Sequence, residues 1–248
     1  MIKNKSPRAK HGPRGIELLY EDDDIVVVNK PSGLLTMGTD RDKSRTAHTI
    51  LNEYVRKGNS KSRNRIYIVH RLDRDTSGIL IFAKSEKVKL LLQEQWKDTE
   101  KKYLTVVYGE LSPKEGTISS YLAENSAYSV YSTPDSTKGK LSHTAYKVLK
   151  ETKGFSLLEI HLLTGRKHQI RVHLSEKGHP VVGDSKYGKS GDGYNCLALH
   201  ARSFSCTHPI TGKPLFFETA IPEFFIRLVG RVGAGKEELP LPSGTGRV

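Results

Sequence analysis

The sequence predicts an α+β fold, in which a few helices interrupt a series of β-strands. Runs of β-branched and aromatic residues recur along the chain and are bounded by turn-forming residues, which is typical of strands. Between them, two segments place their apolar residues at helical spacing. Helices set within a mainly β order favour the α+β class.

The individual elements follow from the same patterns. Residues 18–33 are expected to form two strands joined by an acidic turn and ended by a Pro-Ser-Gly break. Residues 46–57 and 85–100 are expected to be helices, the second with an apolar side that contains Val88, Leu91, Leu92 and Trp96. The remaining strands are expected at 78–85, 101–111, 142–151, 155–165 and 196–209. No internal repeat is visible.

The composition indicates a basic protein with one main folded unit. Forty Lys and Arg against 27 Asp and Glu give the 248 residues a formal charge of +13, which favours polyanionic partners, above all nucleic acid. Residues 1–14 carry five basic and no acidic side chains and are predicted to be a flexible basic arm. Residues 230–248 are rich in Gly and Pro and are predicted to be a flexible tail. The folded unit is therefore expected over residues 15–229.

The expected localisation follows from the absence of a signal peptide and of a membrane-spanning segment in the sequence. The N-terminus has no apolar run of the signal-peptide kind, and the longest apolar stretches are too short to span a bilayer. Two cysteines in a chain of this size do not suggest a disulfide framework. We expect a cytoplasmic monomer that does not associate with membranes.

The stretch VHRLDRDTSG, residues 69–78, holds two carboxylates among three basic side chains immediately before an apolar strand. A surface cluster of ion pairs is one interpretation. A divalent metal held by Asp73 and Asp75 is disfavoured, because the neighbouring arginines would repel it. Arginine beside a carboxylate favours the anionic form and can also contact phosphate, so the pattern suits a reactive carboxylate that faces RNA.

A second charged segment, LLTGRKHQIRVHL at 162–174, follows a predicted strand. It could be the solvated start of a basic helix. Alternatively, its Thr-Gly turn would direct the basic side chains that follow toward an anion. The loop GDSKYG at 183–188 has turn-forming residues, a lysine and an aromatic, which alone indicate little.

Two other motifs are weaker. GRVGAGK at 230–236 has the spacing of a phosphate-binding loop, but Glu237 replaces the magnesium-binding hydroxyl and no helix can follow. Cys196, His200, Cys206 and His208 could suggest zinc, yet their spacing is not that of a zinc knuckle, and a strand with small apolar cysteines explains them. We therefore predict no metal and no cofactor.

Taken together, the motifs resemble the RluA-type RNA pseudouridine synthases. HRLDRDTSG, KKYLTVVYG, TGRKHQIRVHL, GHPVVGDSKYG and LALHARSF occur in the order and spacing of that family, and the resemblance covers residues 16 to about 226. It implies a mixed, mostly antiparallel sheet flanked by helices, and cofactor-free isomerisation of a uridine in RNA. This sequence departs from the family in one respect. Many members carry an RNA-binding module before the catalytic domain, whereas here only about fifteen residues precede the region of resemblance.

The resemblance implies roles for individual residues. Asp73 is expected to be the catalytic carboxylate, with Arg166 as its basic partner. Tyr103 is expected to stack on the target base and to take part in proton transfer. Ile170 is expected to line the pocket, and Arg71 to contact RNA near the gap left by the flipped base.

His70 and Arg171, in the same two charged motifs, are further candidates for substrate binding. Asp75 is interpreted as structural or as lying at the rim of the site.

The chemistry of the reaction agrees with these residues. The N1–C1′ bond must break and a C5–C1′ bond must form, which calls for a carboxylate beside the base or sugar. Flipping the base out of its stack calls for an aromatic platform. Whether Asp73 attacks the base, attacks C1′ or removes a sugar proton is left open.

Two other functions fit parts of the pattern, an RNA-binding protein without activity and an RNA N-glycosidase. The substrate is expected to be a stem-loop of rRNA or tRNA, and the sequence does not choose between the two.

Overall fold

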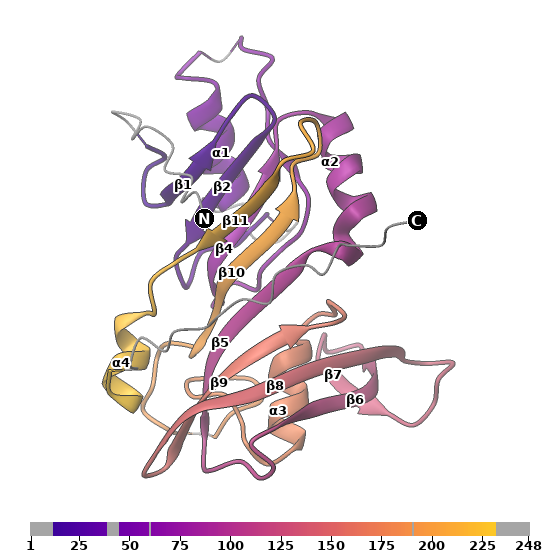
Figure 1. Cartoon of the computed structure of the whole chain (residues 1–248), viewed down its shortest axis with the longest axis vertical. Helices are drawn as coiled ribbons and strands as arrows, with labels where there is room; N and C mark the ends of the chain where they lie inside the picture. Colours follow the sequence, from indigo (N-terminus) through magenta and orange to yellow (C-terminus); the bar gives the residue numbers. More distant parts are fainter. Residues whose placement is uncertain (1–11, 39–44, 60, 190, 232–248) are drawn as a thin grey trace, which may run out of the picture.

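The computed structural model describes residues 12–38, 45–59, 61–189 and 191–231, which form a single sheet flanked by helices (Figure 1). The strands are β1 (Glu17–Glu21), β2 (Ile25–Lys30), β3 (Tyr67–Ile68), β4 (Ser77–Ala83), β5 (Glu100–Tyr108), β6 (Glu115–Glu124), β7 (Val130–Thr133), β8 (Lys140–Thr152), β9 (Phe155–Leu162), β10 (Leu199–Thr207) and β11 (Pro214–Glu218). The helices are α1 (Ala47–Val55), α2 (Glu86–Glu94), the 3₁₀-helix η1 (Gln95–Asp98), α3 (Gln169–Glu176) and α4 (Glu223–Val229). Within these ranges, every helix is too short or too polar to cross a membrane.

The sheet is mostly antiparallel. Its strand order is β1-β2-β4-β10-β5-β9-β8-β6-β7, with β11 paired to β10 and β3 paired to β4. The pair β4–β10 is parallel, whereas the other strand pairs in the described residues are antiparallel. The predicted α+β class and the mixed, mostly antiparallel sheet are therefore confirmed.

Strands β2 and β4 are buried on both faces. Val26, Val28 and Phe82 face a core that includes α1, whereas Val27 and Ile81 face a core that includes α2. Figure 1 shows the two helices on opposite sides of these strands. Burial on both faces explains why both segments read as continuous apolar runs rather than as alternating patterns.

Gly78 permits the close approach of β4 and β10. Its φ is +112°, and a Cβ atom at this position would lie 2.3 Å from the carbonyl oxygen of Ala201. A side chain here would therefore strain both backbones. The approach fixes the chain at the end of the motif 69–78, so the charged segment is anchored at the start of β4.

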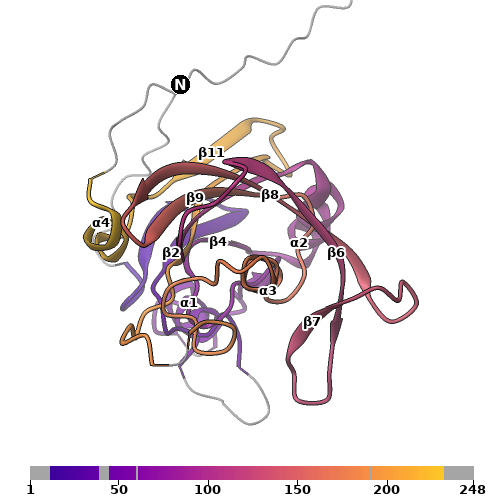
Figure 2. The same cartoon turned by 90° about the horizontal axis from the view of Figure 1, so that it is seen from below.

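Helix α3 lies inside the curve formed by β9, β8, β6 and β7 (Figure 2). Ile170 and Leu174 pack against the core of β5 and β9, while Val172 packs with Leu122 of β6 and Val130 of β7. Because the helix is short and buried on several sides, it lacks a single apolar stripe. The structure therefore gives a helix where the sequence favoured only a turn with directed basic side chains or the start of a solvated helix.

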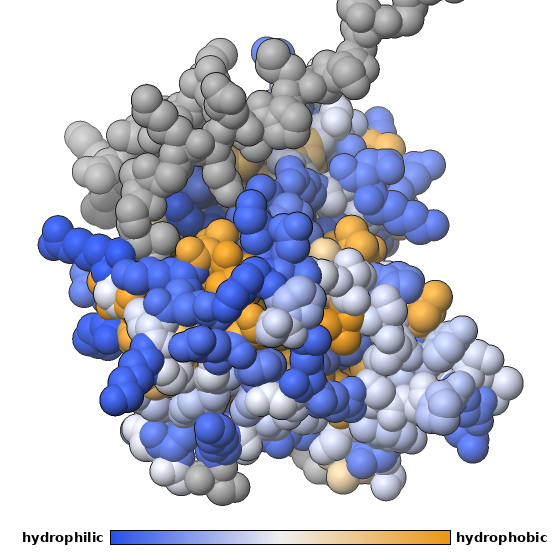
Figure 3. Space-filling model, turned by 60° about the horizontal axis from the view of Figure 1, so that its bottom comes forward, coloured by the Kyte–Doolittle hydropathy of each residue, from blue (hydrophilic) through white to orange (hydrophobic). Residues whose placement is uncertain are grey.

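The exposed surface is largely polar. On the face shown in Figure 3, hydrophilic side chains surround several small apolar areas. Most of the predicted arm 1–14, most of the predicted tail 230–248 and most of the segment 230–236 lie outside the described residues.

Candidate active site

A pocket lies where the loop between β3 and β4, strand β5 and the start of α3 meet. Six of the seven residues predicted for the site contribute to its walls. The lining residues are Arg71, Leu72, Asp73, Thr76, Tyr103, Leu162, Arg166, His168, Gln169, Ile170, Arg171 and Leu199. The fold thus brings the two charged motifs together, although nearly 100 positions separate Asp73 from Arg171 along the chain.

Asp73 lies at the pocket with its side chain 23% exposed. The preceding residue is held on both sides of its backbone, because the Thr36 hydroxyl donates to the Leu72 carbonyl at 2.8 Å and accepts from the Leu72 N–H at 3.2 Å. The Asp73 carboxylate faces Arg171 Nη1 at 3.4 Å and His168 Nε2 at 3.8 Å. It is therefore held by its backbone while its oxygens remain accessible from the pocket.

Arg171 is the cationic partner of Asp73. Its Nε and Nη2 each donate to the fully buried Asp184 carboxylate at 2.7 Å, which leaves Nη1 to approach Asp73. Burial lowers the pKa of Arg171, but the hydrogen bonds and charge of Asp184, with a smaller contribution from Asp73, reverse the effect, so the pKa is raised. The arginine is consequently a fixed positive charge in the wall of the pocket.

His168 lies on the other side of the carboxylate. It immediately precedes α3 and has a left-handed backbone, with φ 53° and ψ 15°. Burial lowers its pKa to about 4 against the opposing effect of Asp73, with further lowering by Arg171, Lys167 and Lys186. The imidazole is therefore neutral at pH 7.

Tyr103 projects from β5 into the same pocket and is partly buried. Burial raises the pKa of its hydroxyl, and the charge of Asp73 raises it further. The hydroxyl therefore keeps its proton at neutral pH. An aromatic ring with a protonated hydroxyl beside a carboxylate is suited to holding a planar polar ring and to transferring a proton.

Lys30 ties two loops together beneath the site. Its side chain is completely buried, and its ammonium donates to the carbonyls of Pro31, Leu34 and Arg74 at 3.0, 2.7 and 2.9 Å. Burial lowers the pKa of Lys30 to about 8, opposed by the charges of Asp75 and Asp73. Because Arg74 follows Asp73, this lysine fixes the loop that carries the carboxylate.

Gln169 shapes the loop that carries Arg166. Its Oε1 accepts from the Arg166 N–H at 3.0 Å and from the Thr164 hydroxyl at 2.9 Å. Its Nε2 donates to the His143 carbonyl and the Thr144 hydroxyl on β8. A buried amide with all of these contacts sets the position of a loop that has no regular structure of its own.

The structure corrects the partner expected for Asp73. In the part of the chain that is described, the cationic partner of Asp73 is Arg171, the neutral imidazole of His168 lies 3.8 Å away, and no ion pair joins Asp73 to Arg166. Arg166 lines the pocket without this pairing. Arg171, expected to bind substrate, has its guanidinium directed to Asp184 and Asp73 instead.

The structure also corrects the expectation for His70. Its ring lies 4.6 Å from that of Trp96 and stacks on Phe204, and its Nε2 accepts the Ile81 N–H at 3.2 Å. Burial, helped by the charge of Lys101, lowers its pKa to about 3. His70 is thus a neutral packing residue that points away from the pocket, whereas the adjacent Arg71 is exposed beside it.

The two histidines considered for zinc have other partners, and the two cysteines are free. His200 bonds to the hydroxyls of Ser77 and Thr219, both at 2.8 Å, and His208 Nε2 bonds to Asp22 at 2.9 Å. Cys206 is buried, which raises the pKa of its thiol to about 12. These contacts are those of structural side chains.

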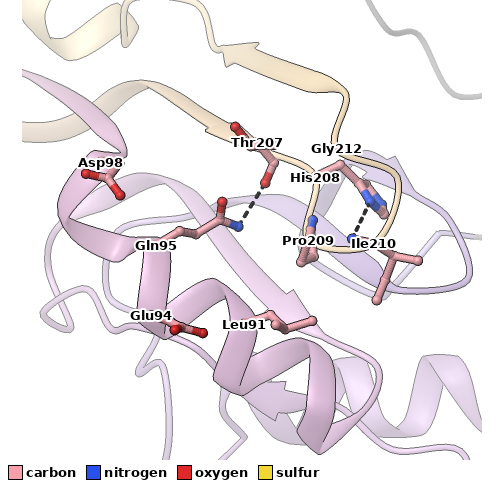
Figure 4. Close-up of a pocket in the computed structure, with 9 residues that line it drawn as sticks. All are labelled: Leu91, Glu94, Gln95, Asp98, Thr207, His208, Pro209, Ile210 and Gly212. Carbon is pink, nitrogen blue, oxygen red and sulfur yellow. Dashed lines mark hydrogen bonds between the residues drawn. The ribbon is translucent and has the colours of Figure 1, made fainter.

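A larger cavity of about 410 Å³ lies between α2 and the turn that joins β10 to β11 (Figure 4). It contains none of the residues predicted for the site. Its visible polar contacts are structural, such as Gln95 donating to the Thr207 carbonyl and the Ile210 N–H donating to His208 Nδ1. The smaller pocket around Asp73 is therefore the candidate active site.

Several residues that contribute to the site were not among the predicted ones, and four of them are polar or aromatic side chains near α3: His168, Gln169, Asp184 and Tyr187. All four lie in the segments 162–174 and 183–188, which the sequence marked as motifs. The motifs could have directed attention to them, but their contacts depend on how two distant loops meet.

Comparisons with known proteins agree with this geometry. A family model described as RNA pseudouridylate synthase matches residues 24–176, more than half of the chain. An uncharacterised RNA pseudouridine synthase of Bacillus subtilis, YhcT, is 35% identical over 212 residues, covering 84% of this chain and 69% of the relative. Ribosomal large subunit pseudouridine synthase C of Rickettsia bellii is 34% identical over 218 residues, covering 85% and 70%.

A solved structure agrees with the fold. Human RNA pseudouridylate synthase domain containing 4 superimposes with a TM-score of 0.72 at 26% identity. The superposition covers 85% of this chain and 90% of the human one.

Proposed function

Because the chain belongs to the RluA-type RNA pseudouridine synthases and is therefore an RNA pseudouridine synthase, we propose that it isomerises one specific uridine of a structured RNA with Asp73 as its catalytic carboxylate. The observation that carries the proposal is the contact of Asp73 with Arg171 beside Tyr103 in a single pocket. Within that pocket, Asp73 is the one carboxylate among the lining residues.

The reaction requires each of these groups. The N1–C1′ bond breaks, the uracil turns, and a C5–C1′ bond forms; the hydrogen on C5 is lost and one is gained at N1, so the mass is unchanged. Asp73 acts on the base or on the sugar, and Arg171 keeps its carboxylate oriented. Tyr103 and Ile170 hold the flipped base between an aromatic and an aliphatic side chain.

The RNA approaches from the exposed side of the pocket. Arg71 is exposed there and can contact a phosphate or the space left by the flipped base. The charge of +13 favours such binding.

We propose large-subunit rRNA, rather than tRNA, as the substrate. Relatives in Rickettsia bellii and Zymomonas mobilis, 34% and 33% identical to this chain, are named ribosomal large subunit pseudouridine synthases. Mapping of pseudouridines in total RNA with and without the gene identifies the position. A lost modification in tRNA alone would overturn the choice of rRNA.

The variant Asp73→Asn tests the catalytic assignment. Asn is nearly isosteric but has neither the charge nor the nucleophilic oxygen, so turnover should fall below detection while folding and RNA binding persist. The matched control is Asp75→Asn, two residues further along the same motif, which is outside the pocket lining and should remain active. Substantial turnover by Asp73→Asn would refute the assignment.

The products distinguish the alternative functions. An isomerase leaves the mass of the RNA unchanged and the chain intact, a glycosidase releases free uracil, and a binding protein does neither. Mass spectrometry of the RNA and of the small-molecule fraction measures all three outcomes.

A further inference from the structure

We propose that Tyr187 and His168 are positioning residues which together present a neutral N–H donor to the carboxylate of Asp73. The inference rests on the proposed catalytic role of Asp73. It concerns two loops that the fold brings together, since Tyr187 lies in the loop after α3 and His168 lies directly before that helix.

The direction of the hydrogen bonds determines which imidazole nitrogen carries the proton. The Val130 N–H on β7 donates to the Tyr187 hydroxyl oxygen at 2.9 Å, and this oxygen lies 2.8 Å from His168 Nδ1. No further hydrogen-bond partner of that hydroxyl is present in the described part of the chain. Because the oxygen accepts from Val130, its own hydrogen is free to be donated to His168 Nδ1, and we infer this direction because it gives the hydroxyl hydrogen and Nδ1 each a partner. The ring proton is thereby placed on Nε2.

The protonated nitrogen is the one that faces Asp73. His168 Nε2 lies 3.8 Å from Asp73 Oδ2, slightly longer than a hydrogen bond. Such contacts are often long before substrate binds and shorten in the reactive complex. An N–H edge attracts the carboxylate, whereas the other tautomer would point a lone pair at it and repel it. Tyr187 thus determines whether the imidazole of His168 attracts or repels the carboxylate of Asp73.

The surroundings keep the imidazole neutral. Burial is the largest cause that lowers the pKa of His168 to about 4; the charge of Asp73 opposes it, and the charges of Arg171, Lys167 and Lys186 lower the pKa further. Tyr187 contacts His168 edge-to-face at 5.5 Å, and the Arg171 guanidinium lies over the tyrosine ring at 5.2 Å. Arg171 therefore supplies the positive charge beside Asp73, and His168 supplies an uncharged N–H donor.

The backbone of His168 supports a specific role for this side chain. Its φ of 53° lies in the left-handed region, which disfavours residues with a Cβ. Such strained positions persist where the surrounding contacts hold them and cluster at functional sites. The left-handed turn is what directs the ring between Tyr187 and Asp73.

The test uses Tyr187→Phe, which keeps the ring over Arg171 and removes only the hydroxyl. We expect kcat to fall about tenfold or more, with KM for the RNA within twofold, because the loss affects orientation rather than binding. The substitution also removes the acceptor of the Val130 N–H, which lowers stability. Turnover is therefore measured well below the melting temperature of the variant. The control is Tyr54→Phe. It removes a hydroxyl that donates to Glu21 over 2.7 Å and does not line the pocket, so it should keep the wild-type kcat.

A spectroscopic measurement tests the tautomer without any activity assay. Long-range proton–nitrogen NMR of the full chain should give an unprotonated Nδ1 for His168 in the wild type and a changed tautomer ratio in Tyr187→Phe. The double variant with His168→Asn should be no slower than His168→Asn alone, because the tyrosine acts through the histidine.

Three results would overturn the inference: a proton on Nδ1 in the wild type, an unchanged kcat in Tyr187→Phe, or additive losses in the double variant. Asp73→Asn in the same assay keeps the two proposals separate. If that variant is active, the catalytic assignment fails, while the tautomer measurement still decides the inference about His168 and Tyr187.

Discussion

The guanidinium of Arg171 lies 3.4 Å from the carboxylate of Asp73 although two of its other nitrogens are already bound by Asp184. A side chain held in this way cannot rotate to follow a departing partner. Asp73 is therefore oriented against a fixed charge, and the cost of fixing that charge is met when the protein folds rather than when RNA binds.

Replacing Arg171 by Lys should impair catalysis strongly. Lysine keeps the charge but has no fork, so it can pair with Asp184 or approach Asp73, but not both. Loss of one positioned donor typically lowers kcat by about 100-fold or more. Single-turnover kinetics on a confirmed RNA substrate measures the effect.

The matched control for that variant is Arg166→Lys. Arg166 lines the same pocket but is not paired with Asp73 in this structure, so the slowing should be smaller than for Arg171→Lys. A larger loss for Arg166→Lys would mean that the contact with Asp73 passes to Arg166 when RNA binds.

Tyr103→Phe should separate stacking from proton transfer. The ring remains available to the base, so RNA affinity should stay within twofold, whereas loss of a proton-transfer group typically costs about 100-fold or more in kcat. Binding and turnover are measured on the same RNA. Tyr108→Phe, on the same strand, removes a hydroxyl that donates to Asp192 and should leave kcat unchanged. Full activity of Tyr103→Phe would limit this residue to stacking.

Lys30→Met should lower both stability and turnover. Methionine has a similar length but no donor, so the carbonyls of Pro31, Leu34 and Arg74 lose their shared partner. Removing the desolvated charge offsets part of this loss, and we expect the free energy of unfolding to fall by about 2 kcal/mol. Urea denaturation measures the change.

Lys89→Met is the surface control for Lys30→Met. Its ion pair with Glu86 is a surface contact one helical turn apart, so removing it should change stability by less than about 0.5 kcal/mol. Equal effects of the two substitutions would contradict a special role for the buried lysine.

Stability should fall between pH 6.5 and pH 4, partly because of His200. Burial, with a smaller effect of Arg202, lowers its pKa from 6.5 to about 4, so the unfolded chain takes up a proton in this range before the folded protein does. The contribution, about 3 kcal/mol, is present above pH 6.5 and is lost as the pH falls through about 4. Urea denaturation at pH 7 and pH 5 measures the part of this loss that falls above pH 5.

His200→Gln isolates this contribution, because glutamine does not titrate. The variant should be less stable at pH 7 yet lose less stability than the wild type between pH 7 and pH 5. An unchanged pH dependence would assign the acid loss to other groups, including His70 and His168, whose pKa values burial also lowers.

The sequence by itself determined the class of the fold and the family. The β-branched runs at β2, β4 and β5 and the helical spacing at α1 and α2 are local patterns, since a strand repeats every two residues and a helix every 3.6. The charged motif around Asp73 and the one around Arg166 are each a continuous stretch of the sequence. Both kinds of signal can therefore be read without knowing the tertiary contacts.

The tertiary structure alone decided which side chains meet. Neighbouring residues of a loop can point in opposite directions, so His70 packs against Trp96 while Arg71 faces the pocket. Arg171 and Arg166 lie five positions apart, yet only the short helix α3 and the buried Asp184 direct Arg171 to Asp73. Such contacts join positions about 100 residues apart, and they depend on packing and burial, which no local pattern in the sequence records.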